Sequence, residues 1–300
     1  MIPRIKISDS FEMSRLAVGF WRLADWGFSE NELLRFVEEQ IDIGVTTFDH
    51  ADIYGGYRCE SAFGNALFNS SVARDKIEIV TKCGIKVVSE NRPENNIHCY
   101  DTSKQYIIDE TENSLRNLKT DYIDVLLIHR LDYLMNAEEV AEAFIRLKEE
   151  GKVRYFGVSN FFRPQFELLQ SYLPFKLITD QVEMNLFNFH HLENGDSEFF
   201  QMRKIAPMIW SPLAGGRIFT EQSEKAERVR YVLGELKNET GACFDEIALA
   251  WLLKIPINPI LVLGSSKIER IKSASNSFDI NLTNEQWYRL WTASKGHDIP

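Results

Sequence analysis

The sequence predicts an α/β protein in which residues 1–300 form a single domain folded as a (β/α)8 TIM barrel. Eight short apolar runs recur along the chain, most of them roughly 30 residues apart, which is the size of a βαβ unit. The runs are apolar almost throughout, as is typical of parallel strands buried on both faces. The segments between them show helical periodicity. No Pro/Gly/Ser-rich linker divides the chain.

The expected strands follow from these runs. They are Leu16–Phe20, Thr46–Asp49, Ile77–Lys82, Ile123–His129, Tyr155–Ser159, Leu177–Val182, Met208–Ser211 and Ile260–Leu263. Helix start signals lie between them: Ser29 with Glu32, and Asn136 with Glu139, each have the spacing of a capping box. An open, doubly wound sheet is the alternative fold. The first strand–helix junction lacks the G-x-G-x-x-G pattern, which weakens that alternative.

Three segments extend the barrel pattern. Gly84–Thr102 is long and polar and contains Pro93, so we expect a loop over one barrel end. The first dozen residues fit a hairpin that closes the other end. Residues Asn281–Lys295 predict a C-terminal helix with Thr283 as its cap and Trp287, Leu290 and Trp291 as its buried stripe.

Composition narrows the class of protein. With 44% hydrophobic residues the chain can build a large core, and its net charge of −10 with no basic run argues against nucleic-acid or anionic-membrane partners. The N-terminus has no apolar signal region, and no apolar run is long enough to span a membrane. Four unpatterned cysteines indicate reduced thiols. We therefore expect a cytoplasmic protein that is a monomer or weak oligomer.

Polar residues gather at the C-terminal ends of the expected strands, where barrel enzymes build their active sites. Taken singly, each has an ordinary structural interpretation as a cap, a solvated charge or a buried hydrogen-bonded group. Their recurrence after consecutive strands favours function. They are Asp49 with Tyr54 in the following loop, Lys82, His129, Ser159 with Asn160, Gln181, and Ser211.

The motifs around these residues resemble the aldo-keto reductase superfamily, particularly its bacterial monomeric branch. The resemblance spans the whole chain, with the motifs in the family's order. They are FDHADIYGG (48–56), TKCG (81–84), LLIHR (126–130), GVSNF (157–161), DQVEMN (180–185), WSPLAGG (210–216) and GSSKIER (264–270). The resemblance implies an NADP(H)-dependent reductase that converts a small-molecule aldehyde or ketone into an alcohol.

The resemblance also implies catalytic roles that the chemistry supports. A carbonyl that accepts hydride needs a proton donor at its oxygen, and the implied donor is Tyr54. An ammonium beside a phenol lowers its pKa, a role that falls to Lys82, with Asp49 pairing to hold Lys82 in place. His129 is expected to orient the carbonyl oxygen.

The same resemblance implies a cofactor site. Ser159, Asn160 and Gln181 match positions that hold the nicotinamide carboxamide, and Trp210 matches an aromatic residue that stacks on the nicotinamide ring. The turn that includes Ser211, Leu213 and Gly215 matches the loop around the pyrophosphate. Arg217 after it is either part of that site or a solvated side chain.

Arg270 matches the arginine that binds the 2′-phosphate of NADPH, with Ser265 and Lys267 beside it. Three positions depart from the common pattern: Gly264, Ser273 and Ala274 replace a Lys, a Glu and an Asn. NADPH is therefore the expected cofactor, with NADH as an alternative.

Two rival functions use the same residues. The first is a metal-dependent hydrolase, suggested by two clusters of possible ligands: Asp49, His50 and Asp52, and His190 with His191. Asp49 and His50 would point to opposite faces of a strand, and the two histidines at 190 and 191 fit a solvent-exposed loop. No full ligand set is evident, so no metal is expected. The other rival is a cofactor-sensing, non-enzymatic subunit, since fold does not fix function.

The substrate pocket is the least defined part of the site. Trp21 is expected on one of its walls. Arg130 has two interpretations: an ion pair with Asp132 or another nearby carboxylate, or contact with an anionic group of the substrate.

Overall fold

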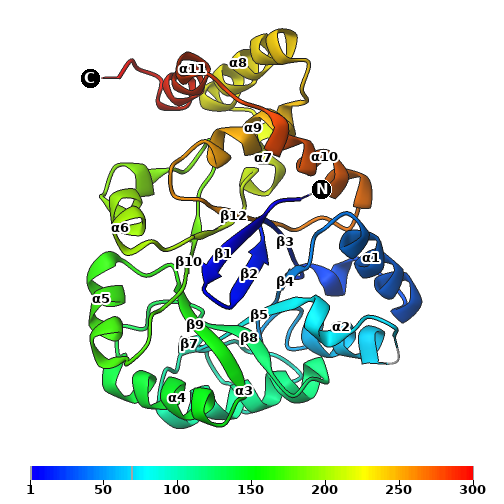
Figure 1. The fold of residues 1–300 in the computed structure, drawn as a ribbon, viewed down its shortest axis with the longest axis vertical. Helices are drawn as coiled ribbons and strands as arrows, with labels where there is room; N and C mark the ends of the chain where they lie inside the picture. The colour runs from blue at the N-terminus through cyan, green and yellow to red at the C-terminus, as the bar shows by residue number, and fades with distance from the viewer. Residues whose placement is uncertain (1, 69, 300) are drawn as a thin grey trace.

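The computed structural model describes residues 2–68 and 70–299. Within them eight parallel strands close into a barrel surrounded by helices (Figure 1). This confirms the predicted (β/α)8 fold and excludes the open sheet. The barrel strands are β3 (Leu16–Gly19), β4 (Thr47–Asp49), β5 (Glu78–Cys83), β8 (Ile123–Ile128), β9 (Val153–Ser159), β10 (Asp180–Glu183), β11 (Met208–Trp210) and β12 (Ile260–Leu263).

The largest boundary difference is in the sixth barrel strand, β10. The expected strand began at Leu177, whereas β10 begins at Asp180. The residues before β10 run beside β9 and form single hydrogen bonds, from Ile178 N to Phe156 O at 2.9 Å and from Val158 N to Thr179 O at 3.1 Å. An apolar run shows that a segment is buried, but not where its regular ladder begins.

Burial on both faces explains why the strands are so apolar. Side chains such as Ala17, Val80 and Leu127 point into the barrel and form one cluster with the N-terminal hairpin. Side chains on the other face, such as Val18 and Phe48, pack beneath the outer helices in a second and larger cluster. Each strand therefore buries successive residues on alternate faces.

The helices begin where the sequence signals indicate. Ser29 and Glu32 form the predicted capping box of α1. At α4, Asn136 caps through the Glu138 N–H, so only the cap and not the full box is present. The helices are α1 (Glu30–Asp42), α2 (Cys59–Phe68), α3 (Lys104–Leu118), α4 (Ala137–Glu149), α5 (Arg163–Tyr172), α6 (Asp196–Arg203), α7 (Arg217–Thr220), α8 (Glu224–Thr240), α9 (Phe244–Leu253), α10 (Ile268–Ser275) and α11 (Asn284–Lys295).

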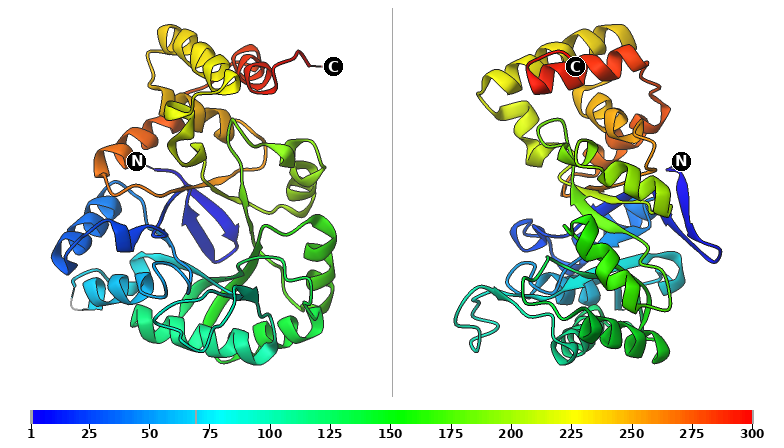
Figure 2. Two further views of the ribbon diagram at one scale, coloured as in Figure 1. Left: turned by 180° about the vertical axis from the view of Figure 1, so that it is seen from behind. Right: turned by 90° about the vertical axis from the view of Figure 1, so that its left-hand side faces the viewer.

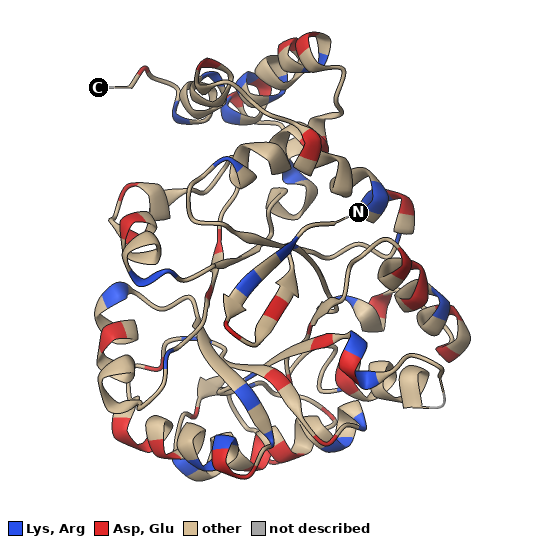
Figure 3. Cartoon of the chain, in the orientation of Figure 1, with Lys and Arg blue, Asp and Glu red and all other residues tan. Residues whose placement is uncertain are grey.

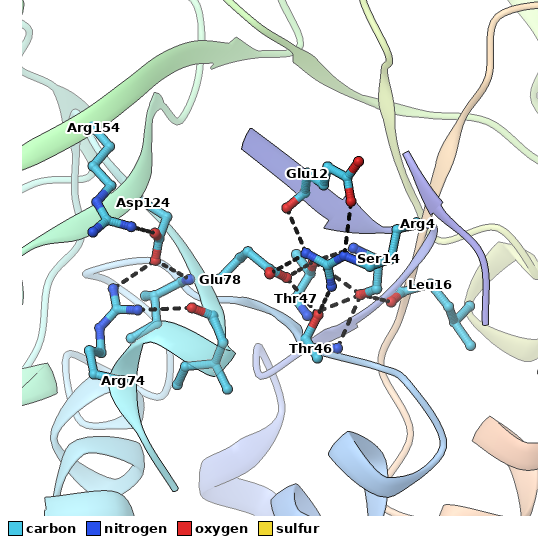
Figure 4. Close-up of polar contacts among 12 residues, drawn as sticks. Arg4, Glu12, Ser14, Leu16, Thr46, Thr47, Arg74, Glu78, Asp124 and Arg154 are labelled. Atoms are coloured by element: carbon cyan, nitrogen blue, oxygen red, sulfur yellow. Dashed lines mark hydrogen bonds and ion pairs between the residues drawn. The ribbon is translucent and has the colours of Figure 1, made fainter. Parts of the chain in front are cut away.

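The N-terminal hairpin closes one barrel end, as predicted. Strands β1 (Arg4–Ser8) and β2 (Phe11–Ser14) pair antiparallel, and in Figure 1 they lie across the barrel opening. Phe11 stacks on Tyr155 of β9 with ring centres 4.4 Å apart. Arg4 donates to Glu78 Oε1 at 2.7 Å, which ties the hairpin to the start of β5 (Figure 4).

The segment Gly84–Thr102 projects from the opposite barrel end (Figure 2). It is not wholly irregular, because β6 (Ile85–Lys86) and β7 (Cys99–Tyr100) pair antiparallel within it. Tyr57 anchors it: its hydroxyl accepts a hydrogen bond from Val87 N at 2.9 Å. The segment therefore forms a fixed wall beside the C-terminal ends of the strands.

The predicted C-terminal helix is α11, which packs against α8 to one side of the barrel (Figure 2). Thr283 and Gln286 form its capping box. Leu290 is fully buried, while Trp287 and Trp291 are half-buried rather than buried as expected. Trp287 stacks on Trp251 of α9, with ring centres 4.8 Å apart.

Charged residues of both signs alternate along the outer helices, with no basic stripe in the view of Figure 3. Among the helices of residues 2–68 and 70–299, none combines the length and the apolar character needed to cross a membrane. Within these same residues the four cysteines are free thiols.

Candidate active site

Four of the predicted site residues meet at the C-terminal end of the barrel. Asp49 is the last residue of β4, Lys82 lies near the end of β5, and His129 directly follows β8. Tyr54 lies in the turn after β4. Parallel strands bring these positions to the same barrel end, as the strand pattern predicted.

Lys82 is the centre of this group. Its Nζ donates to both carboxylate oxygens of Asp49, at 2.8 and 2.9 Å, to the carbonyl of His50 at 2.7 Å and to the hydroxyl of Tyr54 at 3.1 Å. The Lys82 side chain is completely buried. Burial alone would lower the pKa of Lys82, but Asp49 and Tyr54 raise it above its usual value, so the side chain is an ammonium.

The pKa of Tyr54 is raised above its usual value, because burial opposes the phenolate more strongly than Lys82 stabilises it. Asp49 adds to the increase. Lys82 does lower the pKa of Tyr54, as expected, but the effect of burial is larger and the net shift is upward. Tyr54 is consequently a neutral phenol, which is the protonation state that a proton donor requires.

His129 is held as a neutral imidazole. Burial, followed by the charges of Lys82 and Arg130, lowers its pKa well below the usual value. Its ring lies edge-on to that of Tyr54, with centres 5.7 Å apart. Neutral imidazole retains one donor and one acceptor nitrogen. The ring can therefore hydrogen-bond to a ligand beside the phenol.

A chain of hydrogen bonds joins four further predicted residues. Trp210 Nε1 donates to Asn160 Oδ1 at 3.0 Å, and Asn160 Nδ2 donates to Ser159 Oγ at 2.7 Å. Ser159 Oγ in turn donates to the backbone carbonyl of Gln181 at 2.9 Å. The Gln181 side chain donates to Asp49 Oδ1 at 2.7 Å, which connects this chain to Lys82. Asn160 has a φ of 56°, a left-handed conformation uncommon outside glycine.

The turn after β11 lies beside this chain. Ser211, Ala214, Gly215 and Gly216 all have positive φ, so the backbone folds tightly. No atom lies within 4 Å of a Cβ added at Gly216, so glycine is favoured there by its positive φ and not by lack of space. Arg217 donates from Nε to the Ala214 carbonyl at 3.3 Å and pairs with Glu221, the residue after α7, at 3.4 Å. Its side chain is exposed and does not line the cavity described below, which favours its solvated interpretation.

A cavity of about 940 Å³ brings these groups together. Its lining includes every predicted site residue except Lys82, which lies beneath Tyr54, and Lys267. Ser265 and Arg270 therefore face the cavity, whereas Lys267 only donates its backbone N–H to Ser265 Oγ, at 3.2 Å. The walls also include Trp21, which is 63% exposed, and Ile85, His98 and Tyr100 from the projecting segment.

Comparisons with known proteins agree with this arrangement. The profile of the Aldo/keto reductase family matches residues 15–294. The chain belongs to the aldo/keto reductase family. It is 50% identical to the oxidoreductase YcsN of Bacillus subtilis over the full length of both chains, and 39% identical to a 6-dehydroglucose reductase of Agrobacterium fabrum over 99% of this chain and all of that one.

A solved structure supports the same assignment. The thermostable aldo-keto reductase Tm1743 superposes with a TM-score of 0.82 at 26% identity, covering 97% of this chain and all of the other. Aldo/keto reductases are NAD(P)-dependent oxidoreductases, and this chain is one of them by family.

Sequence reasoning missed several lining residues of this aldo/keto reductase. Arg22 follows Trp21 in the loop after β3, and an added Cβ on Gly215 would lie 3.9 Å from its guanidinium. Asp245 at the start of α9 and Phe219 of α7 also line the cavity. The loop position directly after a strand end was the available signal for Arg22. Asp245 and Phe219 come from helices, and a search for polar residues at the ends of strands does not detect residues in helices.

Two expectations about histidines have different outcomes. Asp49 and His50 do lie on opposite sides of β4, since Asp49 bonds to Lys82 while His50 stacks on Phe20 with ring centres 4.8 Å apart. The expectation that His191 is exposed was wrong. It is buried, and Asp196 Oδ2 lies 2.6 Å from its Nδ1. No cluster suited to a metal ion occurs within residues 2–68 and 70–299.

Proposed function

We propose that this aldo/keto reductase uses NADPH to reduce the carbonyl group of an aldehyde or ketone to an alcohol, with Tyr54 as proton donor. The observation that carries the proposal is the position of the Tyr54 hydroxyl, 3.1 Å from the ammonium of a fully buried Lys82–Asp49 pair at the wall of the cavity. A buried ion pair costs desolvation energy, and apolar side chains of similar volume would stabilise the fold as well or better. The presence of the pair beside the Tyr54 hydroxyl therefore supports a role in acid catalysis more than a purely structural one.

Each residue of the group has a role consistent with its contacts. Tyr54 donates its proton to the carbonyl oxygen as negative charge develops there. Lys82 stabilises the phenolate that remains, and Asp49 holds Lys82 in position. Neutral His129 donates a hydrogen bond that orients the carbonyl oxygen. A reduced nicotinamide supplies the hydride when it is bound.

The cavity residues fit a nicotinamide dinucleotide. Asn160 Nδ2 keeps a second hydrogen after its bond to Ser159, which suits a carboxamide oxygen, and the indole of Trp210 offers a flat face to an aromatic ring. The turn with Ser211, Leu213 and Gly215 suits a pyrophosphate. At the far end of the cavity, Arg270 and Ser265 near the start of α10 suit a 2′-phosphate.

Arg270 is the basis for proposing NADPH over NADH, because only NADPH has a phosphate at that end. Ala274 and Ser273 do not oppose either cofactor. Ala274 is small, and Ser273 directs its single hydroxyl hydrogen toward the carboxylates of Asp245 and Glu246, at 3.1 and 3.2 Å. The similarity to a 6-dehydroglucose reductase supports an aldehyde among the substrates.

The direct test is oxidation of NADPH with a panel of aldehydes and ketones, measured by the loss of reduced-nicotinamide absorbance. We expect turnover with members of the panel and the corresponding alcohols as products. NADPH binding without turnover of any carbonyl would instead indicate a cofactor-sensing protein, and absence of binding would contradict the cofactor assignment.

A further inference from the structure

Arg130 is a cation without a protein partner in the cavity wall. It directly follows His129, is half-buried, and forms no ion pair or hydrogen bond with any residue of 2–68 or 70–299. Its guanidinium carbon lies 5.6 Å from the ring centre of Trp210. A cation–π contact of this length leaves the N–H donors of the guanidinium unused.

The nearest acidic residue in sequence, Asp132, does not pair with Arg130. Asp132 is buried and accepts hydrogen bonds from Thr102 Oγ1 at 2.7 Å and from Leu134 N at 2.9 Å. Its carboxylate thus connects the end of the projecting segment to the loop after β8. The interpretation of Arg130 as the ion-pair partner of Asp132 is therefore wrong.

Other carboxylates of the cavity are also engaged. Asp49 is bonded to Lys82 and Gln181, and Asp245 accepts a hydrogen bond from Ser273. The side chains that the projecting segment adds to the wall, Ile85, His98 and Tyr100, include no acid. A half-buried guanidinium loses hydration without gaining an anion, and a ligand that supplies the anion recovers this energy.

We propose that Arg130 is the binding subsite for an anionic group, a carboxylate in the first instance, on the carbonyl substrate. The inference rests on the proposed function and specifies its substrate class: aldehydes or ketones that also carry a carboxylate. The planar guanidinium can hold a carboxylate through two parallel hydrogen bonds. Because Arg130 is adjacent to His129 in sequence, the anion and the reacting carbonyl are held by neighbouring residues.

The alternative is that Arg130 acts on the reaction centre itself. Burial dominates the pKa of both Tyr54 and His129, but the charge of Arg130 also lowers both. If Arg130 has that role, its substitution should change kcat/KM by the same factor for every substrate. Substrate selectivity therefore distinguishes the two roles, and the pH profile of kcat supplies a second readout.

The experiment compares 4-formylbenzoate with its methyl ester, which has the same reacting group and no charge. We expect native kcat/KM to favour the carboxylate by roughly 10- to 100-fold, the range of one charge-assisted contact. Arg130→Met should abolish the preference, and Arg130→Lys should keep part of it. Arg35→Met removes an equal charge from an exposed position outside the cavity and should leave the preference unchanged.

The outcomes separate this inference from the proposed function. If Arg130→Met lowers kcat/KM for both compounds alike, or if it shifts the pH profile of kcat without changing the preference, the subsite assignment is wrong. An equal loss of preference in Arg35→Met would show that the net charge of the protein, and not a subsite, sets the preference, and this result also overturns the assignment. A native protein that reduces no carbonyl compound contradicts the proposed function instead.

A binding measurement tests the subsite without turnover. Terephthalate has two carboxylates and no reducible carbonyl, so its dissociation constant can be measured by calorimetry with NADP+ present or absent. We expect it to bind native protein at least about tenfold more tightly than Arg130→Met. Equal binding to the two proteins overturns the inference whatever the activity data show.

Discussion

The ammonium group of Lys82 lies 3.1 Å from the hydroxyl oxygen of Tyr54. Lys82 has only donors, so the Tyr54 oxygen must be the acceptor of this bond. The hydrogen of the phenol therefore remains free for the cavity. The remaining two ammonium hydrogens are directed to Asp49 and to the carbonyl of His50, so the contact with Tyr54 completes the coordination of a buried charge.

The first prediction concerns this free hydrogen. Tyr54→Phe removes the hydroxyl and leaves the ring that lies against His129. We expect kcat/KM for carbonyl reduction to fall by roughly 10²- to 10⁴-fold, as for loss of a general acid. The dissociation constant of NADPH, measured by fluorescence titration, should stay nearly unchanged. A variant that keeps near-native kcat would contradict the assignment of Tyr54 as donor.

The second prediction concerns the ion pair beneath Tyr54. Lys82→Met leaves the Asp49 carboxylate buried with Gln181 as its remaining side-chain donor. Breaking a buried pair in this way costs about 3–5 kcal/mol of unfolding free energy. The double variant Asp49→Asn, Lys82→Met has no unpaired charge and should recover much of that loss in urea unfolding. Equal losses in the two variants would show that the charges do not stabilise one another.

The barrel and the meeting of Asp49, Tyr54, Lys82 and His129 at one end of it could be predicted, because both depend on regular patterns. Strands buried on two faces leave continuous apolar runs, and the C-terminal ends of parallel strands meet at one end of a barrel. Asp49, Lys82 and His129 stand out against that apolar background. Their contacts then follow from the closed sheet.

What the sequence could not predict depends on contacts between loops. His191 is buried beside Asp196, five residues later. The Asn194–Gly195 pair between them indicates a turn, but not which side chain that turn buries. Likewise Asp132 bonds to Thr102, which is close in space only because β5 and β8 are neighbours. Because that bond engages the Asp132 carboxylate, the lack of an ion-pair partner for Arg130 among the described residues became visible only with the structure.

The third prediction concerns cofactor choice. Arg270→Ala should weaken NADPH binding by roughly 1.5–3 kcal/mol, the value of a charge-assisted contact to phosphate, and NADH binding by much less. Lys267 does not line the cavity, so Lys267→Ala should have the smaller effect, and the double variant should resemble Arg270→Ala. Dissociation constants for both cofactors provide the measurement. Similar losses for NADPH and NADH would assign Arg270 to the shared adenosine or to the fold.

The fourth prediction concerns stability and pH. His50 is fully buried between Phe20 and Phe63, and neither ring nitrogen has a partner among the described residues. Burial, together with the charge of Lys82, lowers its pKa to about 3. The usual value of about 6.5 applies in the unfolded chain, which therefore binds the proton first. The stability that neutral His50 contributes is complete above about pH 6.5 and is lost as pH falls toward 3.

His50→Phe keeps an aromatic ring in this position and removes the titration. Native protein should lose about 2 kcal/mol of unfolding free energy through His50 between pH 7 and pH 5, and the variant should lose correspondingly less. His129 acts in the same direction, so some slope remains. Asp52 and Asp180 have raised pKa values because of burial, so their contribution to stability is lost as pH rises and partly offsets this slope.

His297→Phe, at an exposed position, is the matched control. Urea unfolding at the two pH values measures the effect, and parallel losses in native protein and His50→Phe would show that His50 is not the group that titrates.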